Sequence, residues 1–104
     1  MALQIEFSQR AEQDIEESFL RIKADAPMNA VRWRRKLEAS LKLLEEPSIR
    51  FGFAPENEHS EREVRQLLFG RYRILHTVDG DVAYILTVRH GARRFMGGKE
   101  VDSL

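Results

Sequence analysis

The sequence predicts an α+β fold in which an N-terminal strand and a helical hairpin precede a three-stranded antiparallel meander. Three short runs rich in Val, Ile, Leu, Tyr and Phe, separated by glycine turns, occupy residues 64–90 and indicate the meander. Two longer stretches before them repeat apolar residues at helical spacing, which indicates two amphipathic helices. We therefore expect residues 1–104 to form a single domain, with one sheet and the helices packed on one of its faces.

The N-terminal part predicts a strand that leads directly into a helix. Leu3, Ile5 and Phe7 alternate with polar residues, which favours a strand of about five residues. Ser8 follows as a natural N-cap. The helix after it carries one apolar stripe, formed by Ala11, Ile15, Phe19 and Ile22. Its opposite face is expected to be solvated and holds Glu12, Asp14, Glu16, Glu17 and Arg21.

A second helix is predicted over residues 27–46. The Asp25-Ala26-Pro27 sequence separates it from the first helix, and proline is favoured at the first helical position. Its buried stripe is expected to consist of Ala30, Trp33 (or Val31), Leu37, Leu41 and Leu44. The basic residues beside Trp33 favour a solvated face, with a nucleic-acid or partner contact as the alternative; they are Arg32, Arg34, Arg35 and Lys36.

The rest of the chain divides into a loop, the meander and a tail. Residues 48–62 are irregular in pattern, and we expect Phe51 and Phe53 to anchor this loop to the core. The second and third runs of the meander are joined by a D-G step, which is a strong hairpin signal. Strict alternation places Val82, Tyr84, Leu86, Val88 and His90 on one face of the last strand. We expect residues 95–104 to be a flexible tail, because they contain a Gly-Gly break and little apolar content.

Composition and charge narrow the classes of function. The chain has 42% hydrophobic and 33% charged residues and no cysteine, which fits a cytoplasmic protein without disulfides or thiolate chemistry. No stretch approaches the roughly 18 apolar residues of a membrane span. The net charge of zero conceals an asymmetry: residues 1–64 carry 10 Lys/Arg and 13 Asp/Glu, and residues 65–104 carry 7 and 4. The positive half indicates either a surface for nucleic acid or an acidic peptide, or pairing with the acidic helices.

The stretch from residue 64 to 94, VRQLLFGRYRILHTVDGDVAYILTVRHGARR, resembles the ParE/RelE superfamily of toxins from type II toxin–antitoxin pairs. The similarity rests on Val64-Arg65-x-Leu67, on Gly70-Arg71-Tyr72-Arg73-Ile74-Leu75 and on Val88-x-His90-Gly91-x-Arg93. Upstream, Pro27…Ala30-Val31-Arg32-Trp33 and Ala54-Pro55-Glu56 are similar as well. The His-Gly-x-Arg ending looks more like the ParE branch than the RelE branch.

This resemblance implies a small cytoplasmic bacterial toxin that is held inactive by a cognate antitoxin and needs no cofactor. For the ParE branch, the implied target is DNA gyrase, which is poisoned by binding. For the RelE branch, the alternative, the toxin is an endoribonuclease that cuts messenger RNA on the ribosome. The antitoxin is expected to lay an amphipathic helix or an extended segment along exposed apolar surface of the helical hairpin or the sheet.

The resemblance also selects site residues. Arg65, Arg73, Arg93 and Arg94 are the expected target-binding residues; a ribonuclease would use Arg65, Arg73, His90 and Arg93. The tyrosine near the C-terminus and the strand lysine of the RelE pattern are absent, which favours a binding toxin over an enzyme. Each residue has a structural alternative: Arg73 can pair with Glu56, and His90 can accept a backbone hydrogen bond. His59 and His76 show no ligand spacing, so no metal site is predicted.

Overall fold

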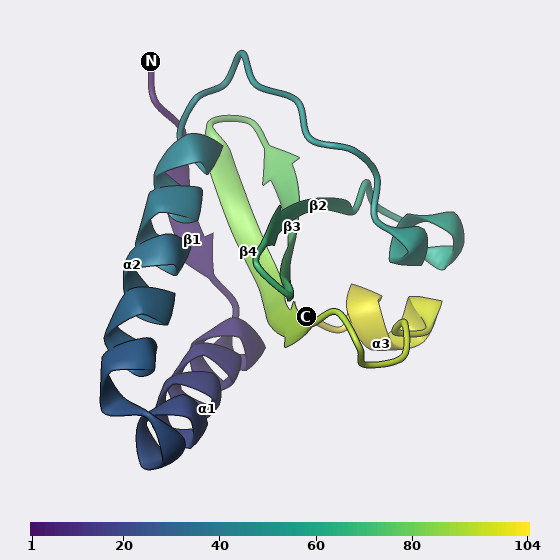
Figure 1. Ribbon diagram of the computed structural model, residues 1–104. Helices are drawn as coiled ribbons and strands as arrows, with labels where there is room; N and C mark the ends of the chain where they lie inside the picture. Colours follow the sequence, from purple (N-terminus) through teal and green to yellow (C-terminus); the bar gives the residue numbers. More distant parts are fainter.

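A computed structural model, which describes all residues 1–104, shows a four-stranded sheet with different cover on its two faces (Figure 1). The elements are β1 (Gln4–Phe7), α1 (Gln9–Asp25), α2 (Pro27–Leu44), the 3-10 helix η1 (Pro55–His59), β2 (Arg65–Phe69), β3 (Tyr72–Asp79), β4 (Val82–His90) and α3 (Gly98–Asp102). The strand order is β1-β4-β3-β2, with β1 parallel to β4 and the other pairs antiparallel. The predicted α+β arrangement is confirmed.

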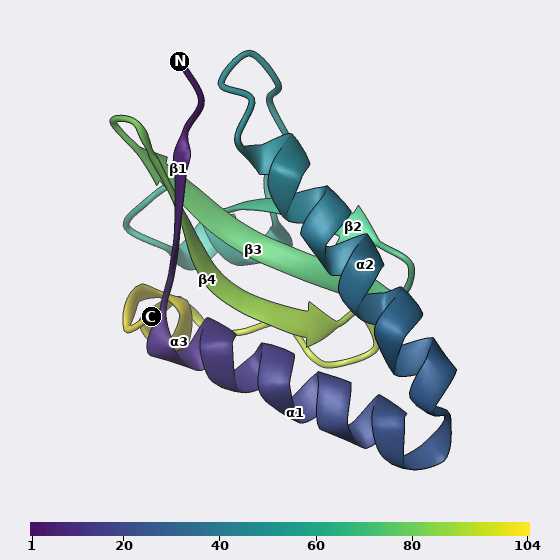
Figure 2. The same cartoon turned by 90° about the vertical axis from the view of Figure 1, so that its left-hand side faces the viewer.

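The helical hairpin covers one face of the sheet. Figure 2 shows α2 crossing in front of the strands and α1 running alongside β4, with the α1–α2 turn beyond the end of β4. The core between these layers combines Trp33 and Leu37 of α2 with Ile74 of β3 and Ile85 and Val88 of β4. Pro27 is the first residue of α2, as predicted, because it needs no intrahelical N–H partner there.

Helix α1 also completes the edge of β4 beyond the end of the short β1. Ser8 caps α1 by accepting from the amide of Ala11 at 2.9 Å, and its Oγ donates to the carbonyl of Leu86 at 2.6 Å. Asp14, one turn further on, accepts hydrogen bonds from the Thr87 hydroxyl and from the Val88 amide. The predicted solvated position of Asp14 is therefore wrong: this carboxylate is buried because it takes the place of a strand at the sheet edge.

A register shift divides β4 into two halves. Leu75 pairs with Thr87 and His76 with Ile85, so Leu86 has no counterpart on β3. A bulge of this kind reverses the inward and outward sides beyond it. The strict alternation predicted for the whole strand is accordingly wrong, since Leu86 and Val88 belong to different cores.

The second face of the sheet is covered by η1 and α3, which lie together beside β3 and β4 (Figure 1). Its core joins Leu75 and Leu86 to Val64, Met96 and Val101. The expected flexible tail at residues 95–104 differs from the structure, in which Met96 and Val101 are buried and a short helix begins at Gly98. Burial of these side chains outweighs the flexibility of the Gly-Gly step.

Candidate functional site

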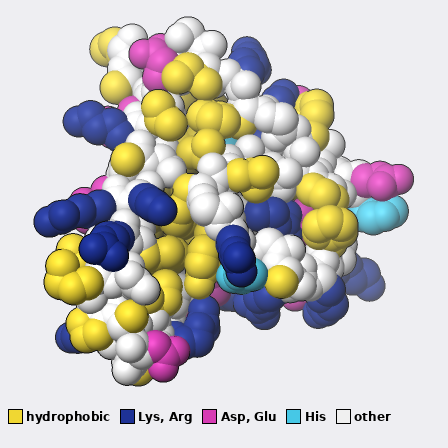
Figure 3. Space-filling model, in the orientation of Figure 1, with side chains coloured by type: hydrophobic (Ala, Val, Ile, Leu, Met, Phe, Trp, Pro, Cys, Tyr) yellow, Lys and Arg dark blue, Asp and Glu magenta, His cyan; other side chains and the backbone are white.

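Three grooves meet at Tyr72 and His90, where β3 begins and β4 ends. One groove is bounded by α1, another by α2, and the third by β2 and Phe95. The region shared by the three grooves is called the Tyr72–His90 surface. Its exposed basic side chains are Arg71 and Arg93 of the loops, Arg21 of α1, and Arg32 and Lys36 of α2. In Figure 3, hydrophobic side chains line the hollow between the helices and the sheet, and Lys and Arg side chains stand around it.

Aromatic side chains form the floor of this surface. Tyr72 lies edge-on to Trp33 at 5.3 Å and to His90 at 5.2 Å, and it stacks on Phe69 at 5.7 Å. The indole Nε1 of Trp33 is buried and has no hydrogen-bond partner, although Trp33 lines the groove beside α2. A floor of packed aromatic rings surrounded by guanidinium groups suits contact with another macromolecule, because Trp, Tyr and Arg side chains are enriched in binding hot spots.

Arg71 reaches this surface through the tight turn between β2 and β3. Gly70 adopts a positive φ of 54°, a conformation that glycine accepts without strain, and the turn leaves the Arg71 side chain in solvent. The carbonyl of Arg71 accepts from the amide of Gly91 at 2.7 Å, which ties this turn to the end of β4. The resemblance did not select Arg71; its place after a turn glycine was the signal that could have found it.

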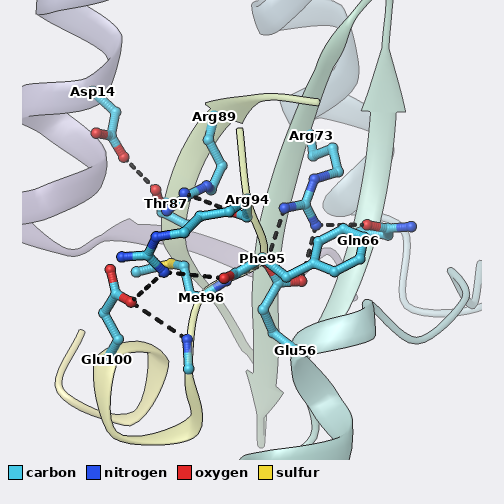
Figure 4. A network of polar contacts seen from close by, with 11 residues as sticks. Asp14, Glu56, Gln66, Arg73, Thr87, Arg89, Arg94, Phe95, Met96 and Glu100 are labelled. Atoms are coloured by element: carbon cyan, nitrogen blue, oxygen red, sulfur yellow. Dashed lines mark hydrogen bonds and ion pairs between the residues drawn. The ribbon is translucent and has the colours of Figure 1, made fainter. Parts of the chain in front are cut away.

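Arg73, a predicted target-binding and catalytic residue, is instead an internal ion-pair partner. Its Nη1 and Nη2 donate to the two carboxylate oxygens of Glu56 at 2.9 and 2.8 Å (Figure 4). Only 5% of Arg73 and 2% of Glu56 are exposed. The structural alternative from the sequence is thus confirmed, and direct contact of Arg73 with a target is not supported, because the pair fastens η1 to the sheet.

The environment of Glu56 keeps its carboxylate ionised. Burial acts to raise the pKa of Glu56, but hydrogen bonds from Arg73 and from the amide of Met96 outweigh burial, and the pKa lies below its usual value. The Met96 bond, at 3.2 Å, also holds the start of the C-terminal segment (Figure 4). One carboxylate therefore joins η1, β3 and the tail.

Arg65 is likewise occupied within the molecule and lies apart from the other predicted residues. Its Nη1 donates to the carbonyl of Phe51 at 2.6 Å, and its guanidinium stacks over the ring of Phe53 at 4.1 Å. It lines a separate depression that also contains His76. Phe53 was expected to anchor the loop in the core, but 52% of it is exposed, so it serves as the base of this cation–π contact instead.

The structure brings His90 and Arg93 together in one groove, where His90 is half-buried and Arg93 is exposed. The Nδ1 of His90 accepts from the amide of Ala92 at 3.0 Å, which is the backbone role that the sequence offered as the alternative to catalysis. Arg94 points away from the grooves, and its Nη1 lies 3.2 Å from Glu100 of α3. Of the predicted target-binding arginines, Arg93 alone is exposed on the Tyr72–His90 surface, because Arg73 lines one of its grooves but is buried.

No group of three or more His, Cys, Asp or Glu side chains is arranged to hold a metal ion. No helix is long and apolar enough to cross a membrane.

Fold and site together define a small α+β protein with an aromatic and basic binding surface at one end of its sheet. The family model of the ParE toxin of the type II toxin–antitoxin system parDE matches residues 5–95. The chain therefore belongs to the ParE toxin family. A solved structure of the chromosomal ParDE toxin–antitoxin system from P. aeruginosa matches the fold with a TM-score of 0.68 and 16% identity, over 86% of this chain and 96% of that chain. No curated protein sequence matches closely enough to count as a relative.

Proposed function

We propose that this toxin stops bacterial growth by binding DNA gyrase through the Tyr72–His90 surface, without cleaving RNA. The observation that carries this proposal is the division of the arginines between two roles. Arg65 and Arg73 are held by internal bonds, whereas Arg71 and Arg93 are free on an aromatic surface suited to binding. Family membership supports a toxin of this kind, and gyrase as its target follows from the resemblance to the ParE branch.

The same geometry argues against ribonuclease chemistry. Metal-free cleavage of RNA needs a base for the 2′-hydroxyl, cations for the phosphorane-like transition state and an acid for the leaving oxygen. Arg65 and Arg73 cannot serve as those cations while they bind Phe51 and Glu56. His90 has one ring nitrogen committed to the amide of Ala92. A binding toxin requires none of these groups to be free.

We further propose that a cognate antitoxin neutralises the toxin in the cytoplasm by covering the outer groove of the helical hairpin. This groove is lined by Phe7, Ile15, Phe19 and Leu20, with Arg34 at its rim. Leu20 is 53% exposed, and an apolar groove between helices suits the apolar face of an amphipathic helix. Leu20→Asp is expected to abolish neutralisation by a co-expressed antitoxin while leaving toxicity intact.

Induced expression in a bacterial host without antitoxin tests the target. Wild type is expected to arrest growth with filamentation and a DNA-damage response, while mapped messenger RNAs remain intact. The double variant Arg71→Ala/Arg93→Ala is expected to lose toxicity, and Arg50→Ala, an exposed arginine at the other end of β4, is the matched control. Cleavage of translated messages by wild type would replace this proposal with a RelE-like ribonuclease.

A further inference from the structure

Arg89 on β4 is a buried cation with too few hydrogen-bond acceptors. Only 2% of the residue is exposed. Its Nη2 donates to the carbonyl of Arg94 at 3.0 Å, but its Nε and Nη1 are buried and have no partner (Figure 4). Because a guanidinium stays charged in proteins and its buried N–H groups are costly when unpaired, these donors call for an acceptor.

The charges around Arg89 are mostly of its own sign. Burial lowers the pKa of Arg89, and the nearby guanidinium groups of Arg93, Arg10 and Arg73 lower it further. Glu56 acts in the opposite direction, but both of its oxygens are bonded to Arg73. Arg10 in turn pairs with Asp14 at 3.2 Å. Arg89 and Arg93 are therefore left without a compensating carboxylate.

This positive region opens toward the groove between α1 and the end of β4. Arg89 and Arg93 both line that groove, which continues into the Tyr72–His90 surface. Asp14 and Glu17 lie along the same groove on α1. These acids disfavour a phosphate group carrying two negative charges. A carboxylate carries a single charge and can accept two hydrogen bonds from one guanidinium group.

We propose that Arg89, assisted by Arg93, binds a carboxylate group supplied by an Asp or Glu side chain of the protein that covers the Tyr72–His90 surface. The source of the carboxylate rests on the proposed function, in which that surface contacts another protein. The site itself does not depend on the target, so small anions test it separately. Failure of gyrase binding and failure of the anion site are thus distinguishable.

The test titrates the full-length isotope-labelled chain with sodium acetate at constant ionic strength and follows the arginine Nε–H resonances by NMR. We expect the Arg89 resonance to shift saturably in the millimolar range of acetate and to stay unchanged in matched sodium chloride. A response to sodium phosphate without one to acetate would overturn the proposal, because the site would then prefer a phosphate group to a carboxylate. A response to none of the three salts would overturn it as well.

Variants provide a second readout that does not require resonance assignment. Acetate is expected to raise the melting temperature of wild type and of the exposed control Arg50→Met, and to leave that of Arg89→Met unchanged. Without acetate, Arg89→Met should melt at or above the wild-type temperature, because methionine removes an unpaired buried charge and keeps the volume. A lower melting temperature in chloride, with the acetate response retained, would mean that Arg89 only supports the Arg94 carbonyl.

Discussion

Removing Arg73 should cost far more stability than removing both members of its ion pair. In Arg73→Met, the carboxylate of Glu56 remains buried and loses two hydrogen bonds of 2.9 and 2.8 Å, keeping only the Met96 amide at 3.2 Å. Breaking a buried pair from one side costs about 3–5 kcal/mol, whereas replacing both partners by apolar residues is often close to neutral. We therefore expect Arg73→Met/Glu56→Leu to recover most of the loss, with a coupling free energy of about 2–3 kcal/mol.

The pH dependence supplies an independent check on this pair. In wild type, the folded pKa of Glu56 lies below 4.5, so its contribution is fully present above that pH and is lost as the pH falls through the folded pKa. In Arg73→Met, burial is no longer outweighed, and we expect the pKa of Glu56 to rise above 4.5. The contribution of this carboxyl is then present below pH 4.5 and is lost as the pH rises through the raised pKa.

Urea denaturation, followed by circular dichroism at several pH values, measures both effects. The free energy lost by Arg73→Met should shrink as the pH is lowered toward acid. Arg71→Met, an exposed arginine two residues away, should stay within about 0.5 kcal/mol of wild type throughout. The reasoning is refuted if the single and double variants are equally destabilised, or if the loss in Arg73→Met does not vary with pH.

Three further predictions concern the fold. Gly98→Ala should undock α3, because a Cβ there would overlap the carbonyl oxygen of His59, whereas Gly97→Ala has open space; amide exchange in α3 should rise only in the former. Asp14→Ala should lower the free energy of unfolding by about 1–3 kcal/mol, because it leaves the Thr87 hydroxyl and the Val88 amide of β4 without an acceptor. If Asp14→Ala lost less stability than Asp14→Asn, which keeps an acceptor oxygen, this prediction would be contradicted. Burial, and secondarily the charge of Arg65, lowers the pKa of His76 below 6.5. The contribution of His76 to stability is therefore present above pH 6.5 and is lost as the pH falls through the folded pKa. His76→Phe should remove this pH dependence in urea denaturation.

The fold followed from the sequence where local signals agreed with the tertiary structure. The Ser8 cap, the Pro27 start of α2 and the glycine turns each set a boundary through backbone chemistry alone. The bulge at Leu86 was not predictable by alternation, because it depends on how β4 meets its neighbours. The helix after Gly97 was missed because its stability comes from burial against η1 rather than from its own composition.

The site followed from the sequence only in part. The pairing of Arg73 with Glu56 and the backbone bond of His90 had both been put forward as structural alternatives, and both occur. Residue type and strand position do not tell an internally bonded guanidinium from a free one, so Arg65 was selected as a target-binding residue and the exposed Arg71 was not. Asp14 was assigned to solvent because periodicity describes a helix alone and ignores an unpaired strand edge beside it.

The central claim, that this ParE-family toxin acts by binding gyrase through the Tyr72–His90 surface, is tested most directly with purified components. The measurement is DNA supercoiling and stabilised DNA cleavage by gyrase, with increasing amounts of toxin. We predict that wild type and Arg50→Ala inhibit supercoiling and trap cleaved DNA, and that Arg71→Ala/Arg93→Ala, shown to be folded, does neither. Unchanged gyrase activity at saturating wild-type toxin, or full inhibition by the double variant, would contradict the claim.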